Sequence, residues 1–164
     1  MKVRRIVAAV ATMSAATIGV AVPAYATMHH ANSATEHFQL AIAGSHQVFI
    51  AHGPITGGGT DDASHDAYDV LHFGNGTLRL NHPDSQSHFN AKVNPKTCFA
   101  AFTITGKYTV DHGTGKYKGV TGHGTYKVSE QALLAKKKTG GCDENSEPKL
   151  FEGSINASGP ISGK

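Results

Sequence analysis

The feature that most constrains this chain is the absence of helical periodicity beyond its N-terminal segment. Between Ala31 and Lys164 no long segment places apolar residues at the spacing of a helix face. Short runs of alternating, β-branched or aromatic residues recur instead, separated by Gly, Asp and Asn, which is typical of strands joined by turns. The expected strands are Glu36–Ile42, Gln47–Thr56, Ala67–Phe73, Thr77–His82, Ser87–Val93, Phe99–Val110, Gly124–Leu134 and Leu150–Ser158. The sequence therefore predicts an all-β protein.

One pair of strands is marked most clearly, as a hairpin over residues 67–82. Asn75–Gly76 stands between two apolar runs, and both residues tolerate the positive φ angles of a tight hairpin turn. Further turns are expected at Gly57–Asp62 and at Asp111–Gly115. The segment Ala132–Lys138 has the propensity of a short helix, and it is either that or the end of a strand.

The number of strands bears on how they are arranged. A chain with eight short strands has to protect their edges, because an exposed edge pairs with other molecules. Closing the sheet removes the edges altogether. We therefore expect an antiparallel eight-stranded barrel, with a two-sheet β-sandwich as the alternative.

The N-terminus has the organisation of a secretory signal peptide. A basic start, Met1–Arg5, precedes the apolar run Ile6–Val22, and small residues at Ala24 and Ala26 predict cleavage after Ala26. The run is rich in Ala and shorter than the roughly 20 residues of a membrane span, which disfavours an anchor. The expected organisation is a signal peptide over 1–26, a mobile tail over 27–34 and a single barrel domain over 35–162, in a secreted, extracellular protein without membrane insertion after cleavage.

The charge balance argues against nucleic acid as a partner. The chain has 15 Lys and Arg against 12 Asp and Glu. Removal of Lys2, Arg4 and Arg5 with the leader leaves 12 of each. Binding to a phosphate backbone needs a basic excess on one face, which this composition does not supply.

The chain has two cysteines, Cys98 and Cys142. In an oxidising compartment, two cysteines without a third most simply form one disulfide. A zinc site or a catalytic thiol would need partner residues at ligand spacing, which the sequence around them lacks.

Three stretches together carry a resemblance to a known family: Gly53–Asp61, Phe73–Leu78 and Gly113–Tyr126. They resemble the secreted actinobacterial proteins with an allene oxide cyclase-like barrel, a fold shared with the plant dirigent proteins. Cys98 stands where such sequences often carry a cysteine. Plant members cyclise an unsaturated epoxide or steer radical coupling inside the barrel, and many bacterial members have no assigned activity. The matching motifs are turn glycines and barrel positions, so the resemblance implies the barrel and no particular activity.

Strand alternation gives candidate residues for the barrel lumen. His52 follows Val48 and Ile50 on one face, and two further histidines follow apolar residues in the same way. If those faces point inward, the imidazoles approach the lumen, although Leu71 and Phe73 on the opposite face leave one of these strands ambiguous. The candidate lumen residues are the histidines His52, His72 and His82 and the aromatic residues Phe49, Tyr68, Phe89, Phe102, Tyr108 and Tyr126.

The sequence contains two candidate metal sites. The acidic residues Asp61, Asp62, Asp66 and Asp69 suggest calcium, but they lack the spacing of a known calcium loop, so a solvated turn is favoured. Cleavage after Ala26 would place His29 third in the mature chain, where the terminal amine, two amides and the imidazole form a square-planar set suited to Cu(II) or Ni(II). No other cofactor is expected.

The sequence favours a barrel that binds a small, largely apolar molecule in its lumen. Two alternatives stay open: an isomerase or cyclase that acts on a reactive small molecule there with His and Asp as proton carriers, and a surface interaction protein with a filled barrel. Catalytic residues, ligand identity and oligomeric state are not predicted.

Overall fold

The computed structural model describes residues 34–43 and 46–163. The expected signal peptide, the N-terminal tail up to residue 33 and the proposed metal ligand His29 lie outside these residues. The described chain forms β1 (Ala34–Ala43), β2 (His46–His52), β3 (Gly57–Asp62), β4 (Tyr68–Phe73), β5 (Gly76–Asn81), β6 (His88–Val93), β7 (Phe99–Gly113), β8 (Thr121–Leu133), β9 (Ala135–Lys136), β10 (Cys142–Asp143) and β11 (Leu150–Ser162). Two single 3-10 turns, η1 (Asp84–Gln86) and η2 (Gly115–Tyr117), complete it.

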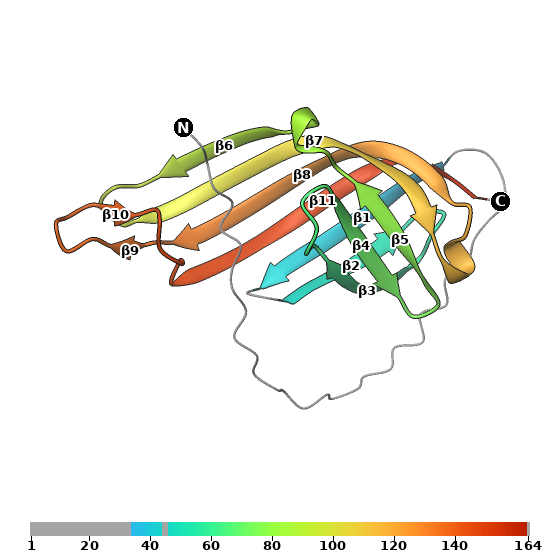
Figure 1. Ribbon diagram of the computed structural model, residues 1–164, viewed down its shortest axis with the longest axis horizontal. Helices are drawn as coiled ribbons and strands as arrows, with labels where there is room; N and C mark the ends of the chain where they lie inside the picture. The colour runs from blue at the N-terminus through green and yellow to red at the C-terminus, as the bar shows by residue number, and fades with distance from the viewer. Residues whose placement is uncertain (1–33, 44–45, 164) are drawn as a thin grey trace, which may run out of the picture.

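The strands form a closed antiparallel barrel, as the sequence predicts, and the sandwich alternative is wrong. Eight strands close the ring in the order β5-β4-β3-β2-β1-β11-β8-β7, and β5 pairs with β7 to complete it. Strand β6 pairs with the first half of β7 and lies outside the ring. In Figure 1, β6, β7, β8 and β11 extend past the short strands β2 to β5. The molecule is therefore a barrel with a curved sheet continuing from one end.

The 67–82 hairpin is confirmed. Tyr68 pairs with Asn81 and Phe73 with Gly76, so β4 and β5 are joined by a two-residue turn at 74–75. Gly76 has a φ of 156°, a left-handed conformation that other residues rarely adopt. The segment 132–138 is strand rather than helix, since β8 runs to Leu133 and β9 follows it.

Strand β3 corrects the expectation of a turn over Gly57–Asp62. Val48 pairs with Thr60 on one side of it, and Thr60 pairs with His72 on the other. A Cβ atom on Gly59 would overlap the backbone carbonyl oxygen of His72, so this close approach of β3 and β4 requires glycine. The predicted number of eight barrel strands is right, but one strand differs. Strand β3, expected as a turn, belongs to the ring, and β6, expected as a barrel strand, lies outside it.

Candidate ligand site on the inner wall of the barrel

The burial pattern shows which face of each strand points into the barrel. In β1, Phe38, Leu40 and Ile42 are buried and their neighbours are exposed. In β2 the buried residues are Phe49 and Ala51, because Phe49 lies opposite Leu40 and Ala51 lies opposite Phe38. Directly opposed residues share a face of the sheet, so this assignment carries around the ring. We call the inward-facing positions of the described barrel strands the inner wall.

One part of the barrel is filled by its own side chains. A single apolar cluster packs there, with exposed fractions of 7% or less. It consists of Phe38, Leu40, Phe49, Ala51, Ile55, Leu71, Phe73, Leu78, Leu80, Tyr108, Val110, Tyr117, Val120, Ala157 and Ile161. Such packing leaves little room for a ligand in this part of the barrel.

The other part keeps its inner wall partly exposed. The inward-facing residues that remain partly exposed there are Phe102, Ile104, Tyr126, Glu130, Phe151 and Ile155. Each of them lies opposite another inner-wall residue, as Phe102 lies opposite Glu130 and Ile104 lies opposite Val128. We call this part, lined by those six residues, the open half. Its wall is mainly apolar and accessible from outside.

An ion pair and an aromatic ring meet beside the open half. His82 Nε2 lies 3.2 Å from Asp69 Oδ2. Asp69 of β4 points inward, because it lies opposite the buried Leu80, and His82 directly follows β5. The backbone of His82 is fixed by donation of its N–H to the carbonyl of Ala67 at 2.8 Å. The His82 ring meets the Tyr126 ring edge to face, with 5.9 Å between centroids. This arrangement holds an imidazole and a carboxylate on the inner wall.

A second carboxyl group, that of Asp61 in β3, faces the same pair. Both of its oxygens are buried, and neither has a hydrogen-bond donor within the described residues. The pKa of Asp61 is raised to about 7. Burial is the largest cause, the charges of Asp69 and Asp62 add to it, and the charge of His82 opposes it. Asp61 can therefore take up or release a proton near neutral pH.

A third carboxyl group lies in the packed part of the barrel. Glu36 is completely buried, and its Oε2 accepts a hydrogen bond from the backbone N–H of Ile55 at 2.7 Å. Burial raises its pKa to about 7, and the bond from Ile55 opposes that rise. Burial, and after it the charge of Glu36, raises the pKa values of Tyr108 and Tyr117 to about 12. Glu36 is thus a carboxyl group held among apolar and phenolic side chains.

The remaining inward-facing acid is Glu130 in β8. It lies between Phe102 of β7 and Gly153 of β11 in the register of the sheet. Burial raises its pKa above the ordinary value. The open half therefore combines an apolar wall with a carboxyl group at its centre.

Five of the nine predicted lumen residues face the barrel interior. Phe49 and Tyr108 belong to the packed core, and His82, Phe102 and Tyr126 belong to the inner wall beside or within the open half. Phe89 lies on β6, outside the ring, opposite Ile104 and with 53% of its surface exposed. Phe89 and Phe102 stack with their centroids 6.0 Å apart, so they form one aromatic surface at the edge of the curved sheet.

The other three predicted lumen residues lie on the outer face, against expectation. His52 stacks on His37 across the surface at 4.8 Å between centroids. Tyr68 contacts the Arg79 guanidinium, 5.2 Å from its ring centroid, and His72 is exposed opposite Thr60. The physical reason is that Leu71 and Phe73 are buried in β4 and Phe49 is buried in β2, which places the alternate residues outside.

The sequence does not mark the inward-facing acids as residues of a lumen site. Asp61 and Asp69 belong to an acidic stretch that suggests calcium and favours a solvated turn, and Glu36 and Glu130 carry no motif. Asp69 precedes Leu71 and Phe73 at a spacing of two, so the buried face of β4 was the available signal for it. Within the described residues, no group of three or more His, Cys, Asp or Glu side chains has the geometry of a metal site.

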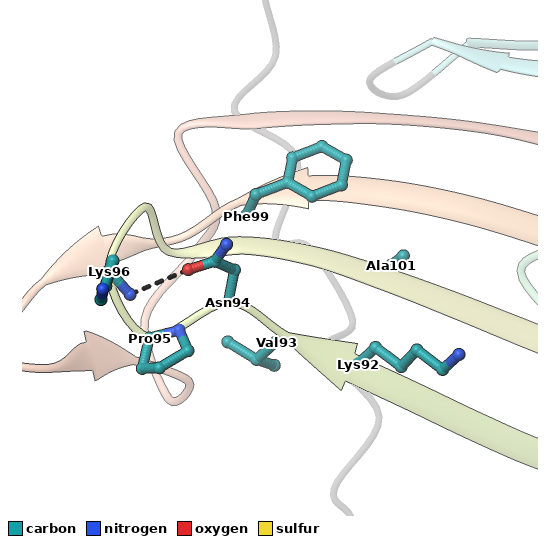
Figure 2. A pocket seen from close by; sticks show the side chains of 7 residues that line it. All are labelled: Lys92, Val93, Asn94, Pro95, Lys96, Phe99 and Ala101. Atoms are coloured by element: carbon teal, nitrogen blue, oxygen red, sulfur yellow. Dashed lines mark hydrogen bonds between the residues drawn. The ribbon is translucent and has the colours of Figure 1, made fainter.

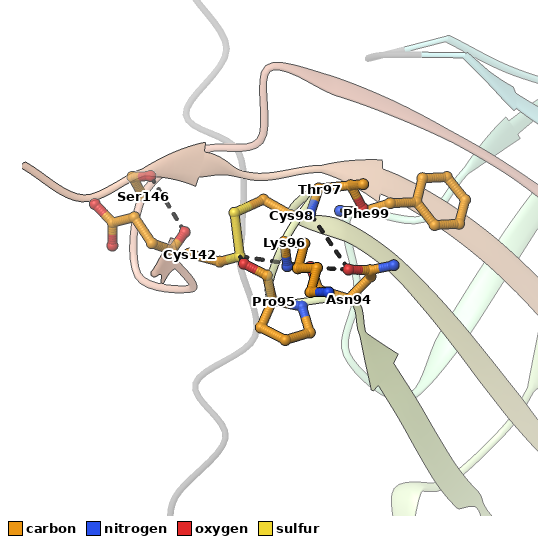
Figure 3. Close-up of a disulfide and its surroundings, with 9 residues drawn as sticks. Asn94, Pro95, Lys96, Thr97, Cys98, Phe99, Cys142 and Ser146 are labelled. Carbon is orange, nitrogen blue, oxygen red and sulfur yellow. Dashed lines mark hydrogen bonds between the residues drawn. A yellow bond between two sulfur atoms is a disulfide. The ribbon is translucent and has the colours of Figure 1, made fainter. Parts of the chain in front are cut away.

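The end of the curved sheet carries the disulfide. Cys98 and Cys142, 44 residues apart, are bonded as predicted (Figure 3). The bond ties the start of β7 to the β9–β10 hairpin, and Leu134 donates its N–H to the Cys98 carbonyl beside it at 2.9 Å. Cys98 packs with Ala100, Ala132 and Leu134 in a small core separate from the main one.

A surface pocket lies beside this bond, at the turn between β6 and β7 (Figure 2). It is lined by Lys92, Val93, Asn94, Pro95, Lys96, Phe99 and Ala101. The Asn94 side-chain oxygen accepts the Lys96 N–H at 3.0 Å and fixes the turn. The lining has no acid or histidine.

Among the residues that the structure describes, no helix has the length and apolar character needed to cross a membrane. Comparison of the chain with protein-family models, curated proteins and solved structures finds no match in any of the three.

Proposed function

We propose that this protein binds a small, largely apolar molecule against the inner wall of the open half. The observation that carries the proposal is the contrast between the two parts of the barrel. One part is filled by buried side chains, whereas Phe102, Ile104 and Phe151 point inward and stay partly exposed. Apolar side chains that stay partly exposed on an inner wall gain free energy when a ligand removes them from water, at about 25 cal/mol per Å².

The location and family of the protein are further proposals. We infer that the chain is secreted, and the signal-peptide pattern and the disulfide support this. We also infer kinship with the allene oxide cyclase-like proteins, which the closed eight-stranded barrel supports. The alternative of a proton-transfer enzyme stays a prediction, supported by the Asp69 and His82 pair on the inner wall.

The binding proposal is tested with Nile red, an uncharged apolar dye whose fluorescence rises in an apolar environment. We expect saturable fluorescence with the wild-type protein and a clear loss of affinity with Phe102→Ala. The matched control is Phe99→Ala, because Phe99 lies on the same strand, faces outward and is 43% exposed. Circular dichroism checks that both variants fold.

Two results would contradict the proposal. Absence of saturable dye binding by the folded wild-type protein would favour the filled-barrel alternative. Loss of binding in Phe99→Ala but not in Phe102→Ala would place the apolar site on the outer surface instead.

A further inference from the structure

The ionisable groups of the inner wall are nearly all carboxyl groups. Its inward-facing positions hold four acids, Glu36, Asp61, Asp69 and Glu130, and one histidine, His82. The Lys and Arg residues of the described barrel strands and of β6 all face outward: Arg79, Lys92, Lys107 and Lys127. Arg79, for example, bonds Asp111 on the surface at 3.0 Å. The inner wall therefore has more carboxyl groups than the chain supplies cations to balance.

Hydrogen-bond donors are also missing beside Asp61. Asp69 has His82 as its partner, but both oxygens of Asp61 are buried without a donor from the described residues. Val48 of β2 pairs with Thr60 of β3. The adjoining positions, Gln47 in β2 and Asp61 in β3, are therefore neighbours on the inner face of the barrel. The Gln47 Oε1 atom is likewise buried and lacks a donor. The three acceptor oxygens thus belong to adjoining inward positions of adjacent strands.

Above about pH 7, where Asp61 is ionised, its unpaired buried oxygens are costly, so they indicate a donor that is supplied from outside the protein. An alkylammonium group presents three N–H donors and a positive charge. A hydroxyl group offers one donor and no charge, and a carboxylate offers neither a donor nor the right sign of charge. Among these groups, the ammonium alone matches both the number of acceptors and the charge of the wall.

Glu36 gives an independent indication of the same kind. Its side chain is fully buried on the inner wall, where its hydrogen bonds come from the backbone N–H groups of Ile55 and His37. Carboxyl groups are therefore a property of the wall and are not confined to the neighbours of Asp61. Above about pH 7, where Glu36 and Asp61 ionise, they attract cations into the barrel and repel anions.

We propose that the molecule bound in the barrel is an organic cation, with an ammonium group against Asp61 and Gln47 and an apolar body along the open half. This inference rests on the proposed binding function and adds the chemical class of the ligand. Aromatic rings near the open half, such as Tyr126 beside His82, suit a cation as well, because ring faces attract positive charge.

The proposal has a consequence for pH. Asp61 faces Asp69 and His82 from the neighbouring strands, with Asp62 beside it in the chain, and its pKa is raised to about 7. An ammonium ligand stays charged across the neutral range, as a lysine does. Below about pH 7 Asp61 holds a proton, which the ligand has to displace before it can bind the carboxylate. We expect its affinity to fall about tenfold between pH 8 and pH 6.

The experiment compares three ligands of equal chain length: decylamine, decanol and decanoate. Each is titrated into the full protein by isothermal titration calorimetry, below the concentration at which it forms micelles. We expect decylamine to bind at least about tenfold more tightly than decanol, and decanoate to bind least well. Only the decylamine affinity should fall at lower pH.

Asp61→Asn is the variant that tests the counterion. It should reduce decylamine affinity at least about tenfold at pH 8, remove its pH dependence and leave decanol affinity unchanged. Asp62→Asn is the matched control, because Asp62 is the next residue in β3, faces outward and is exposed. It should bind all three ligands as the wild type does.

The outcomes separate the two proposals. Equal binding of decanol and decylamine, or preferred binding of decanoate, would overturn the organic cation and leave lumen binding intact. A decylamine affinity that is unchanged in folded Asp61→Asn would overturn the role of Asp61. If neither Nile red nor decylamine binds, both proposals fail. The ranking of ligands by the wild-type protein needs no variant, so it decides the matter even if Asp61→Asn does not fold.

Discussion

The buried carboxyl group of Glu36 leads to an unusual prediction, that this protein becomes less stable as the pH rises from 5 towards 8. Glu36 has no exposed surface, and its Oε2 accepts one backbone hydrogen bond. Its pKa rises from 4.5 to about 7 on folding because burial disfavours the charged form. In this range the folded state holds a proton that the unfolded state has released, so stability falls as pH increases.

The magnitude follows from the two pKa values. A rise from 4.5 to about 7 corresponds to about 3 kcal/mol of folding free energy. This contribution is complete below pH 4.5, is lost progressively up to about pH 7 and changes no further above it. Between pH 5 and pH 8 the loss amounts to about 2.5 kcal/mol. Asp61, whose pKa is raised from 3.8 to about 7, adds a loss of the same sign.

Urea denaturation at pH 5 and pH 8 measures the effect. With the slope typical of small domains, the loss from Glu36 alone corresponds to a midpoint lower by roughly 1 to 2 M at pH 8. Glu36→Gln keeps an oxygen that accepts the Ile55 N–H but cannot ionise, so its stability should vary about 2.5 kcal/mol less over this range. Asp62→Asn, at an exposed position, should keep the wild-type dependence on pH.

This reasoning fails if Glu36→Gln shows the same change in stability between the two pH values as the wild type. It also fails if the wild type is more stable at pH 8 than at pH 5. Surface carboxyl groups with lowered pKa values, such as Asp111, cannot produce that result, because they are ionised in both the folded and the unfolded state throughout this range.

Three further predictions concern stability. Cys98→Ser should lower the unfolding free energy by about 4 kcal/mol, since the bond closes a loop spanning 44 residues, and denaturation of the oxidised wild type is the reference. Gly59→Ala should cost at least about 2 kcal/mol more than Gly57→Ala, because its Cβ would overlap a backbone carbonyl of β4 whereas the nearest atom to a Cβ on Gly57 is 3.4 Å away; thermal melts compare the two. Asp111→Asn removes the surface pair with Arg79 and should change stability by less than about 1 kcal/mol, which a larger shift in the urea midpoint would contradict.

Most of the fold could be predicted from local patterns. The hairpin of β4 and β5 follows from Asn75–Gly76 between apolar runs, and the disulfide follows from a pair of cysteines without a third. Strand β3 could not be predicted in this way, because three glycines in succession are a turn signal in isolation. Only the approach of the facing backbone of β4 makes Gly59 a strand residue, and that contact is between strands.

Which face of each strand points into the barrel is harder to predict from the sequence. In β2 both faces are apolar, since Val48 and Ile50 alternate with Phe49 and Ala51. Alternation alone cannot tell which set is buried, and an error of one residue moves every side chain to the other face. The cross-strand partners decide it: Phe49 lies opposite the buried Leu40, so Val48 and Ile50 remain half exposed or more.

The same ambiguity makes the inward-facing acids hard to recognise in the sequence. Acids are normally exposed, so a pattern that assigns apolar residues to the interior assigns Asp61, Asp69 and Glu36 to the surface. Each of them instead occupies an inward position in a strand whose other inward residues are mostly apolar or glycine. A buried carboxyl group costs stability, and folding alone gains nothing from four of them on one wall. Departures from the pattern that cost stability are expected where a protein binds or reacts with something, which is the physical reason to look for the ligand of this barrel beside Asp61.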